Sequence, residues 1–68
     1  MKEESFGTML RKLRKEKNLS QFQMGRLIGV SDKAISKWEN DYAKPKGTSL
    51  AKISEVLNIS VEDLIKNL

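Results

Sequence analysis

The chain has 68 residues, no cysteine and no histidine, and a formal net charge of +4. This length allows one small domain, which buries only about 60% of the surface that its unfolded chain would expose. Without cysteine or histidine, a disulfide framework is excluded, a structural zinc site is implausible, and the commonest bases and nucleophiles of enzymes are missing. The composition therefore favours a binding protein that uses no cofactor and no metal.

The basic excess lies in the first two-thirds of the chain, whereas residues 48–68 carry a net charge of −1. This distribution is compatible with a polyanionic partner, although many solvated small domains have a similar charge. The longest apolar run near the middle, residues 27–30, is far too short to span a bilayer. The polar N-terminus, which includes acidic residues, does not resemble a signal peptide. We therefore expect a cytoplasmic protein with no membrane segment.

The first predicted helix covers roughly residues 5–17. One stripe at helical spacing defines it, namely Phe6, Leu10, Leu13 and, through its aliphatic stem, Lys17. Basic residues gather toward its C-terminal end, where the helix dipole favours cations. We expect the stripe to face the core and the remaining faces to be solvated.

The second predicted helix starts at a serine cap. The hydroxyl of Ser20 can accept a hydrogen bond from the first turn, and Gln23, three residues later, completes a capping box. The helix is expected to run for about nine residues and to stop at Gly29, since glycine adopts the left-handed conformation without steric cost. Its inward-facing side chains are expected to be Met24, Leu27 and Ile28.

The same cap pattern recurs eleven residues later, where Ser31 starts a third helix that runs to about Asn40. Only Gly29 and Val30 join these two helices, so the helices must cross at a steep angle. This geometry defines a helix-turn-helix unit over about residues 20–40. Gly25 lies one turn before the stop, where a larger side chain would hold the two helices apart.

The third predicted helix has an apolar face and a polar face. Ala34, Ile35 and Trp38 form the apolar face. The polar face carries side chains that can donate hydrogen bonds into a DNA major groove, namely Lys33, Ser36, Lys37 and Asn40. An ordinary solvated helix face would show the same pattern, so this stripe alone does not decide the function.

The remaining chain predicts a loop and two further helices. Pro45 and Gly47 mark a polar loop after the third helix. Thr48 or Ser49 is expected to cap a fourth helix, and Ser60 a short fifth one. We therefore predict an all-α, compact five-helix domain that spans residues 1–68.

Several stretches together resemble the phage repressor/Cro type of helix-turn-helix regulators, often called the XRE family. The matching stretches lie in the family's order and cover nearly the whole chain: residues 13–21, 25–31 and 34–40, Pro45, and residues 50–65. The resemblance implies a lambda-repressor-like DNA-binding domain. In that fold the third helix enters the major groove and the second lies across the DNA backbone.

The resemblance also assigns roles to particular residues. The base-reading positions are Ser31, Asp32, Lys33 and Lys37, with Ser36 as a lesser candidate. The positions that contact the DNA backbone are Gln21, Asn40, Tyr42, Lys44 and Lys46. Arg14 and Glu39 match a structural pair that ties the first helix to the end of the third. If that pair is buried, removal of one partner costs about 3–5 kcal/mol.

Three residues depart from the family pattern. Gly25 replaces the usual alanine. Phe22 stands where the family is usually polar or acidic, and it either covers the stem of Arg26 or marks a contact with another protein. Asp32 would repel phosphates at a base-reading position, unless it accepts from a cytosine amino group or caps its own helix. Trp38 is expected in the core rather than as a platform for base stacking.

The resemblance implies a transcriptional repressor or autoregulator that binds a double-stranded DNA operator as a homodimer, with half-sites about 34 Å apart or a multiple of that spacing. The candidate dimer residues are Val56, Asn58, Ile65 and Leu68. Two alternatives remain open. One is the antitoxin of a toxin–antitoxin pair, which would bind both operator and toxin. The other is the controller protein of a restriction–modification system.

Overall fold

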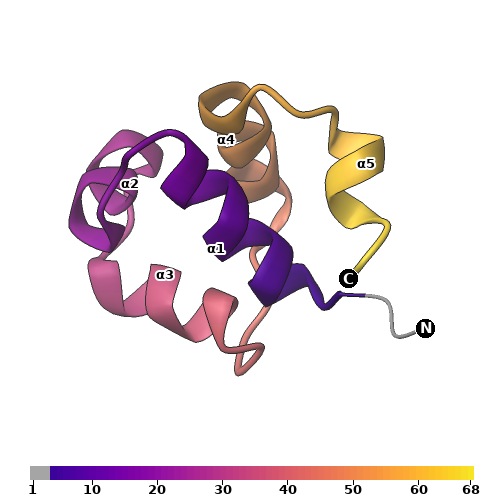
Figure 1. The fold of residues 1–68 in the computed structure, drawn as a ribbon, viewed down its shortest axis with the longest axis horizontal. Coiled ribbons are helices and arrows are strands. Elements are labelled where there is room, and N and C mark those ends of the chain that lie inside the picture. The colour runs from indigo at the N-terminus through magenta and orange to yellow at the C-terminus, as the bar shows by residue number, and fades with distance from the viewer. Residues whose placement is uncertain (1–3) are drawn as a thin grey trace.

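The computed structural model describes residues 4–68 and contains five helices and no strand in that range. They are α1 (Phe6–Glu16), α2 (Gln21–Ile28), α3 (Asp32–Glu39), α4 (Gly47–Leu57) and α5 (Val61–Ile65). Figure 1 shows α1 across the middle of the molecule, with α3 on one side and α4 and α5 on the other, while α2 lies at the C-terminal end of α1 and packs against both α3 and α4. The all-α five-helix prediction is confirmed, while residues 1–3 of the predicted 1–68 domain lie outside the described range.

The core draws one fully buried side chain from each helix. In chain order these side chains are Leu10, Met24, Ile35, Ile53 and Leu64. Complete burial of one such side chain contributes about 1.5–3 kcal/mol. Because isolated helices this short are marginal in water, this packing is what stabilises each of them. Trp38 is 7% exposed and joins this cluster, which confirms that its ring is part of the core.

The helix boundaries follow the predicted caps with one exception. The hydroxyls of Ser20, Ser31 and Ser60 each accept a hydrogen bond from the backbone three residues later, and Ser20 with Gln23 forms the complete capping box. The predicted cap of the fourth helix is wrong. This helix begins at Gly47, with Lys46 as an N-cap residue that makes no side-chain capping bond. Thr48 and Ser49 therefore lie inside its first turn.

Two residues predicted to face inward are exposed instead. Leu27 is 56% exposed because α2 has only eight residues and packs through the narrow face of Met24, Gly25 and Ile28. Gly25 lets this face pack directly on the backbone of Val30 and Ser31, and Leu27 at the edge of the face stays exposed. Lys17 is also exposed, since α1 ends at Glu16 and Lys17 is its C-cap.

Candidate nucleic-acid interface

The turn between α2 and α3 is sharp because two glycines remove side chains from it. Gly29 ends α2 in the left-handed region at φ 89°. A Cβ atom on Gly25 would lie 2.6 Å from the Val30 carbonyl oxygen, closer than real contacts allow. Both predictions about these glycines are confirmed. The absent side chains let α2 pack directly on the segment that leads into α3, and this contact fixes the direction of α3.

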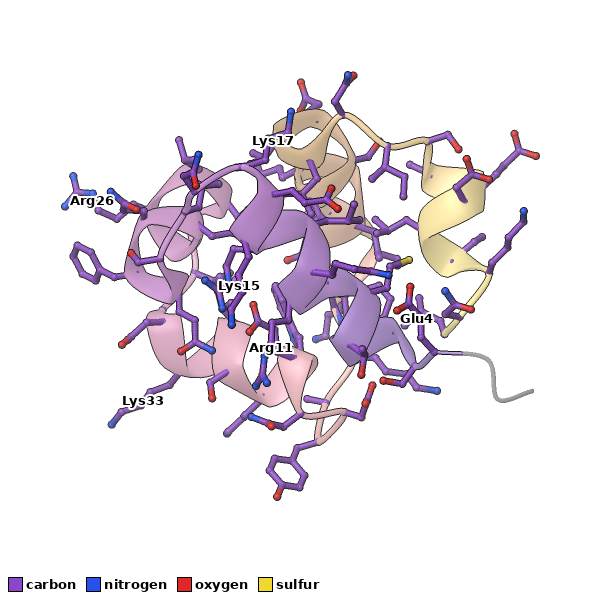
Figure 2. The ribbon with its side chains drawn as sticks, viewed as in Figure 1. Glu4, Arg11, Lys15, Lys17, Arg26 and Lys33 are labelled. Carbon is purple, nitrogen blue, oxygen red and sulfur yellow. The ribbon has the colours of Figure 1, made fainter. Side chains whose placement is uncertain are left out.

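The outer face of α3 carries most of the side chains predicted to read bases. Ser31, Asp32, Lys33 and Lys37 are exposed, and Figure 2 shows Lys33 pointing away from the body of the domain. Ser36 differs, since it is half-buried. Its carbonyl oxygen accepts a hydrogen bond from Nδ2 of Asn40 at 2.8 Å, and its hydroxyl lies 3.4 Å from the same nitrogen.

Asp32 is not the cap of α3. The hydroxyl of Ser31 accepts from the Ala34 backbone N–H at 3.1 Å and fills that role. Among residues 4–68, no side-chain hydrogen bond or ion pair involves Asp32. Its carboxylate stands in the first turn, where the helix dipole favours a negative charge, and is available to an external donor.

Glu39 is the centre of a hydrogen-bond network that joins α1, α2 and α3. Its side chain is fully buried, and its Oε2 accepts from Nε of Arg14 at 2.6 Å. Its Oε1 accepts from Nη2 of Arg14 and Nε2 of Gln21, each at 3.1 Å, and from Nε of Arg11 at 3.4 Å. Arg14 also donates to the Leu19 carbonyl oxygen at 2.7 Å. The network fixes the end of α3 relative to α1 and α2.

The same network sets the charge state of Glu39. Burial raises the pKa of this carboxyl, but the hydrogen bonds from Arg14 and Gln21, the positive charge of Arg14 and the bond from Arg11 outweigh it. The pKa of Glu39 is therefore held below its ordinary value, and the carboxylate stays ionised at neutral pH. Gln21, which the resemblance assigns to contact with the DNA backbone, donates one of its two amide hydrogens to this carboxylate.

Two contacts between α1 and the end of α3 were not predicted from the sequence. The backbone N–H of Gly7 donates to Oδ1 of Asp41 at 2.9 Å. A Cβ atom on Gly7 would collide with the Glu39 carbonyl oxygen and lie 2.6 Å from that of Trp38. The one available signal was Gly7 itself, because glycine inside a helix costs about 1 kcal/mol relative to alanine and implies a compensating contact.

The loop after α3 presents the remaining backbone candidates. Tyr42 is 83% exposed, Lys44 and Lys46 are exposed, and Pro45 between them is buried and anchors the loop. On the other flank of the unit, the Arg26 guanidinium lies 5.9 Å from the centre of the Phe22 ring. This cation–π distance supports the interpretation in which Phe22 covers Arg26.

The candidate dimer residues lie at the α4–α5 end of the molecule. Val56 is half-buried, while Asn58, Ile65 and Leu68 are exposed. Asn58 ends α4 in the left-handed conformation at φ 55°. Val61, which was not predicted from the sequence, is 42% exposed and lies one turn before Ile65 on α5. None of the helices within residues 4–68 is both long and apolar enough to cross a membrane.

The sharp turn, the capped α3 and its outward donors define a helix-turn-helix domain. The helix-turn-helix family model matches residues 10–64, and the chain belongs to this family, in its XRE-type branch. Repressor protein C2 of Salmonella phage P22 is 35% identical over 66 residues, which cover 97% of this chain and 31% of the phage protein. The repressor RghR of Bacillus subtilis is 41% identical over 63 residues, or 91% of this chain and 47% of that protein. The chain thus spans less than half the length of both relatives.

Solved structures show the same fold. The P22 c2 repressor, crystallised in complex with a synthetic operator, superimposes with a TM-score of 0.91 at 33% identity, covering 97% of this chain and 100% of that one. The restriction–modification controller protein C.AhdI from Aeromonas hydrophila superimposes with a TM-score of 0.80 at 28% identity. That alignment covers 88% of this chain and 91% of the controller protein. Both likenesses extend over all or nearly all of the solved chains.

Proposed function

We propose that this chain is a sequence-specific, double-stranded DNA-binding regulator of transcription, acting as a repressor or autoregulator. The observation that carries the proposal is the steep turn at Gly29, which presents Lys33 and Lys37 on a face of α3 directed away from the core. The relatives named as repressors, and the operator complex of the P22 protein, support the same function.

The proposed mechanism divides the contacts between bases and backbone. Lys33 and Lys37 donate to guanine O6 and N7 in the major groove, and Asp32 accepts from a cytosine amino group. Tyr42, Lys44 and Lys46 contact phosphates beyond the end of α3, as does Gln21 at the start of α2. Because the lysines release counterions from DNA, affinity falls as the salt concentration rises.

The base-reading role of α3 is tested on a site selected from a random DNA pool. Lys33→Ala and Lys37→Ala are each expected to weaken binding to that site roughly 5- to 150-fold, since a well-made base contact is worth about 1–3 kcal/mol. Their thermal melts should match wild type because both side chains are exposed. Lys12→Ala is the matched control and should bind normally, since Lys12 is an exposed lysine of α1 that pairs with Glu4. Unchanged affinity of both α3 variants for the selected site would refute these roles.

We further propose that the chain binds its operator as a homodimer through Val56, Asn58, Ile65 and Leu68, because one unit of this size reads few base pairs. Val61 extends this surface on α5. Sedimentation with a palindromic site should give two chains per duplex, with half-sites about 34 Å apart or a multiple of that spacing. A complex of one chain per palindrome would contradict the dimer.

One observation favours a second candidate, the controller protein of a restriction–modification system, namely the structural likeness to C.AhdI. The DNA contacts would be the same in both cases. Genes for a restriction enzyme and a methyltransferase beside this one would favour the controller, and their absence would favour the repressor.

A further inference from the structure

Arg11 is the most loosely held donor to Glu39. Its Nε lies 3.4 Å from Oε1, whereas the bonds from Arg14 and Gln21 are 2.6–3.1 Å long. The Arg11 side chain is 48% exposed, while that of Glu39 is fully buried. Both oxygens of Glu39 keep a partner when Arg11 leaves. Arg11 is therefore not needed to satisfy the buried carboxylate, and its guanidinium can take another partner.

Lys15 adds a second exposed positive charge next to Arg11 on α1. It lies four residues after Arg11, so the two side chains share one side of the helix. Figure 2 shows both side chains directed from α1 toward α3 on the same face of the molecule. Lys15 is exposed, and none of the ion pairs within residues 4–68 includes it. Lys12 differs from Lys15 in being paired, since its Nζ lies 3.1 Å from a carboxylate oxygen of Glu4.

The position of this pair follows from the contact that Arg11 shares with α2. Arg11 and Gln21 donate to the same oxygen of Glu39, so the guanidinium lies beside the first residue of α2. A recognition helix in the major groove has one phosphodiester strand on each side. The loop that carries Lys44 and Lys46 follows the end of α3, and in the proposed complex it contacts the phosphates of one strand. The start of α2, which the helix dipole makes favourable for anions, faces the other strand.

We propose that Arg11 and Lys15 form a phosphate clamp on α1, which holds the DNA strand that passes the first turn of α2. The proposal rests on the proposed function and adds contacts from outside the helix-turn-helix unit. When DNA binds, Arg11 exchanges its long, solvent-screened contact with Glu39 for phosphate oxygens, which match the geometry of a guanidinium. Arg14 and Gln21 keep Glu39 paired, so the recognition helix stays in place.

The salt dependence of binding tests the clamp. Arg11→Gln and Lys15→Gln should each make the slope of log Kobs against log salt shallower by about 0.9, and the double variant by about 1.8. The loss of affinity should be equal for the selected site and for an unrelated duplex, because phosphates carry no sequence information. Arg11→Lys should retain most of the slope. Lys12→Gln, on the same helix and with the same loss of charge, should leave it unchanged.

Thermal melts of the same variants separate the clamp from a purely structural role. A structural Arg11 would give a lower melting temperature for Arg11→Gln with an unchanged salt slope, and that result would overturn the proposal. An equal change of slope in Lys12→Gln would overturn it as well, because the effect would then come from net charge alone. Failure of the wild-type chain to bind any selected duplex would instead remove the proposed function itself.

Discussion

Glu39→Ala is expected to lower the free energy of unfolding by about 3–5 kcal/mol, because it leaves the buried guanidinium of Arg14 without its anion. Among residues 4–68, only the Leu19 carbonyl oxygen would remain as a hydrogen-bond partner for Arg14. Domains are stable by only about 5–15 kcal/mol, so this single change would remove much of the folded population. Urea unfolding at neutral pH measures the effect.

The matched control replaces both partners at once. Arg14→Leu combined with Glu39→Leu should be less destabilised than Glu39→Ala, because it leaves no buried charge unpaired. Equal losses in the two proteins, or a loss below about 1 kcal/mol for Glu39→Ala, would contradict the account of this pair.

The pH dependence of stability tests the role of Glu39 independently. The folded pKa of Glu39 lies below its ordinary value of 4.5. Its ionisation therefore stabilises the fold fully above that ordinary value, and the contribution is lost as pH falls through the folded pKa. Glu39→Gln should therefore lack this part of the loss of stability at acid pH, which urea unfolding at a series of pH values measures.

The second large effect is expected for Gly7→Ala, which places a Cβ atom against the Glu39 and Trp38 carbonyl oxygens. Helix propensity alone would favour alanine by about 1 kcal/mol. The collision with the backbone outweighs this gain. We therefore expect the free energy of unfolding to fall by about 1–3 kcal/mol, as at other overpacked sites. Because α1 must then move from the end of α3, DNA affinity should fall together with stability.

Gly47→Ala is the control for this prediction. A Cβ atom on Gly47 meets no atom within 4 Å, and this glycine has no positive φ. The substitution should be neutral or stabilise by about 0.4–1 kcal/mol through the unfolded chain. The free energies of unfolding of the two variants, measured by chemical unfolding, should therefore change in opposite directions or differ by at least about 1 kcal/mol. A stabilising Gly7→Ala would show that α1 does not approach α3 this closely.

The parts of the fold that follow local rules were predictable from the sequence. Serine caps and the glycine stop act within a few residues of chain, so Ser20, Gly29 and Ser31 marked the helix-turn-helix unit correctly. The left-handed conformations of Asn18 and Asn58, which follow the ends of helices, were missed. Asparagine adopts this conformation only occasionally, whereas glycine does so routinely, so the sequence signal is weaker.

Contacts between distant residues were harder to predict. Gly7 and Asp41 are 34 residues apart, and Arg11 and Glu39 are 28 residues apart. No periodicity links such positions, and only the packing of α1 on α3 brings them together. The pairing of Arg14 with Glu39 was predictable only from the family resemblance. The role of Arg11 had no such guide and depends entirely on the three-dimensional arrangement.

The claim that α3 reads the major groove is tested most directly by changing single atoms of the DNA. In the selected site, 7-deazaguanine removes the N7 acceptor from the major groove, and inosine removes the guanine amino group from the minor groove. The account predicts that 7-deazaguanine weakens wild-type binding about fivefold or more at the guanines contacted by Lys33 and Lys37, while inosine has little effect. The loss should disappear at one of these guanines in Lys37→Ala. Sensitivity to inosine without sensitivity to 7-deazaguanine would place the protein in the other groove and contradict the account.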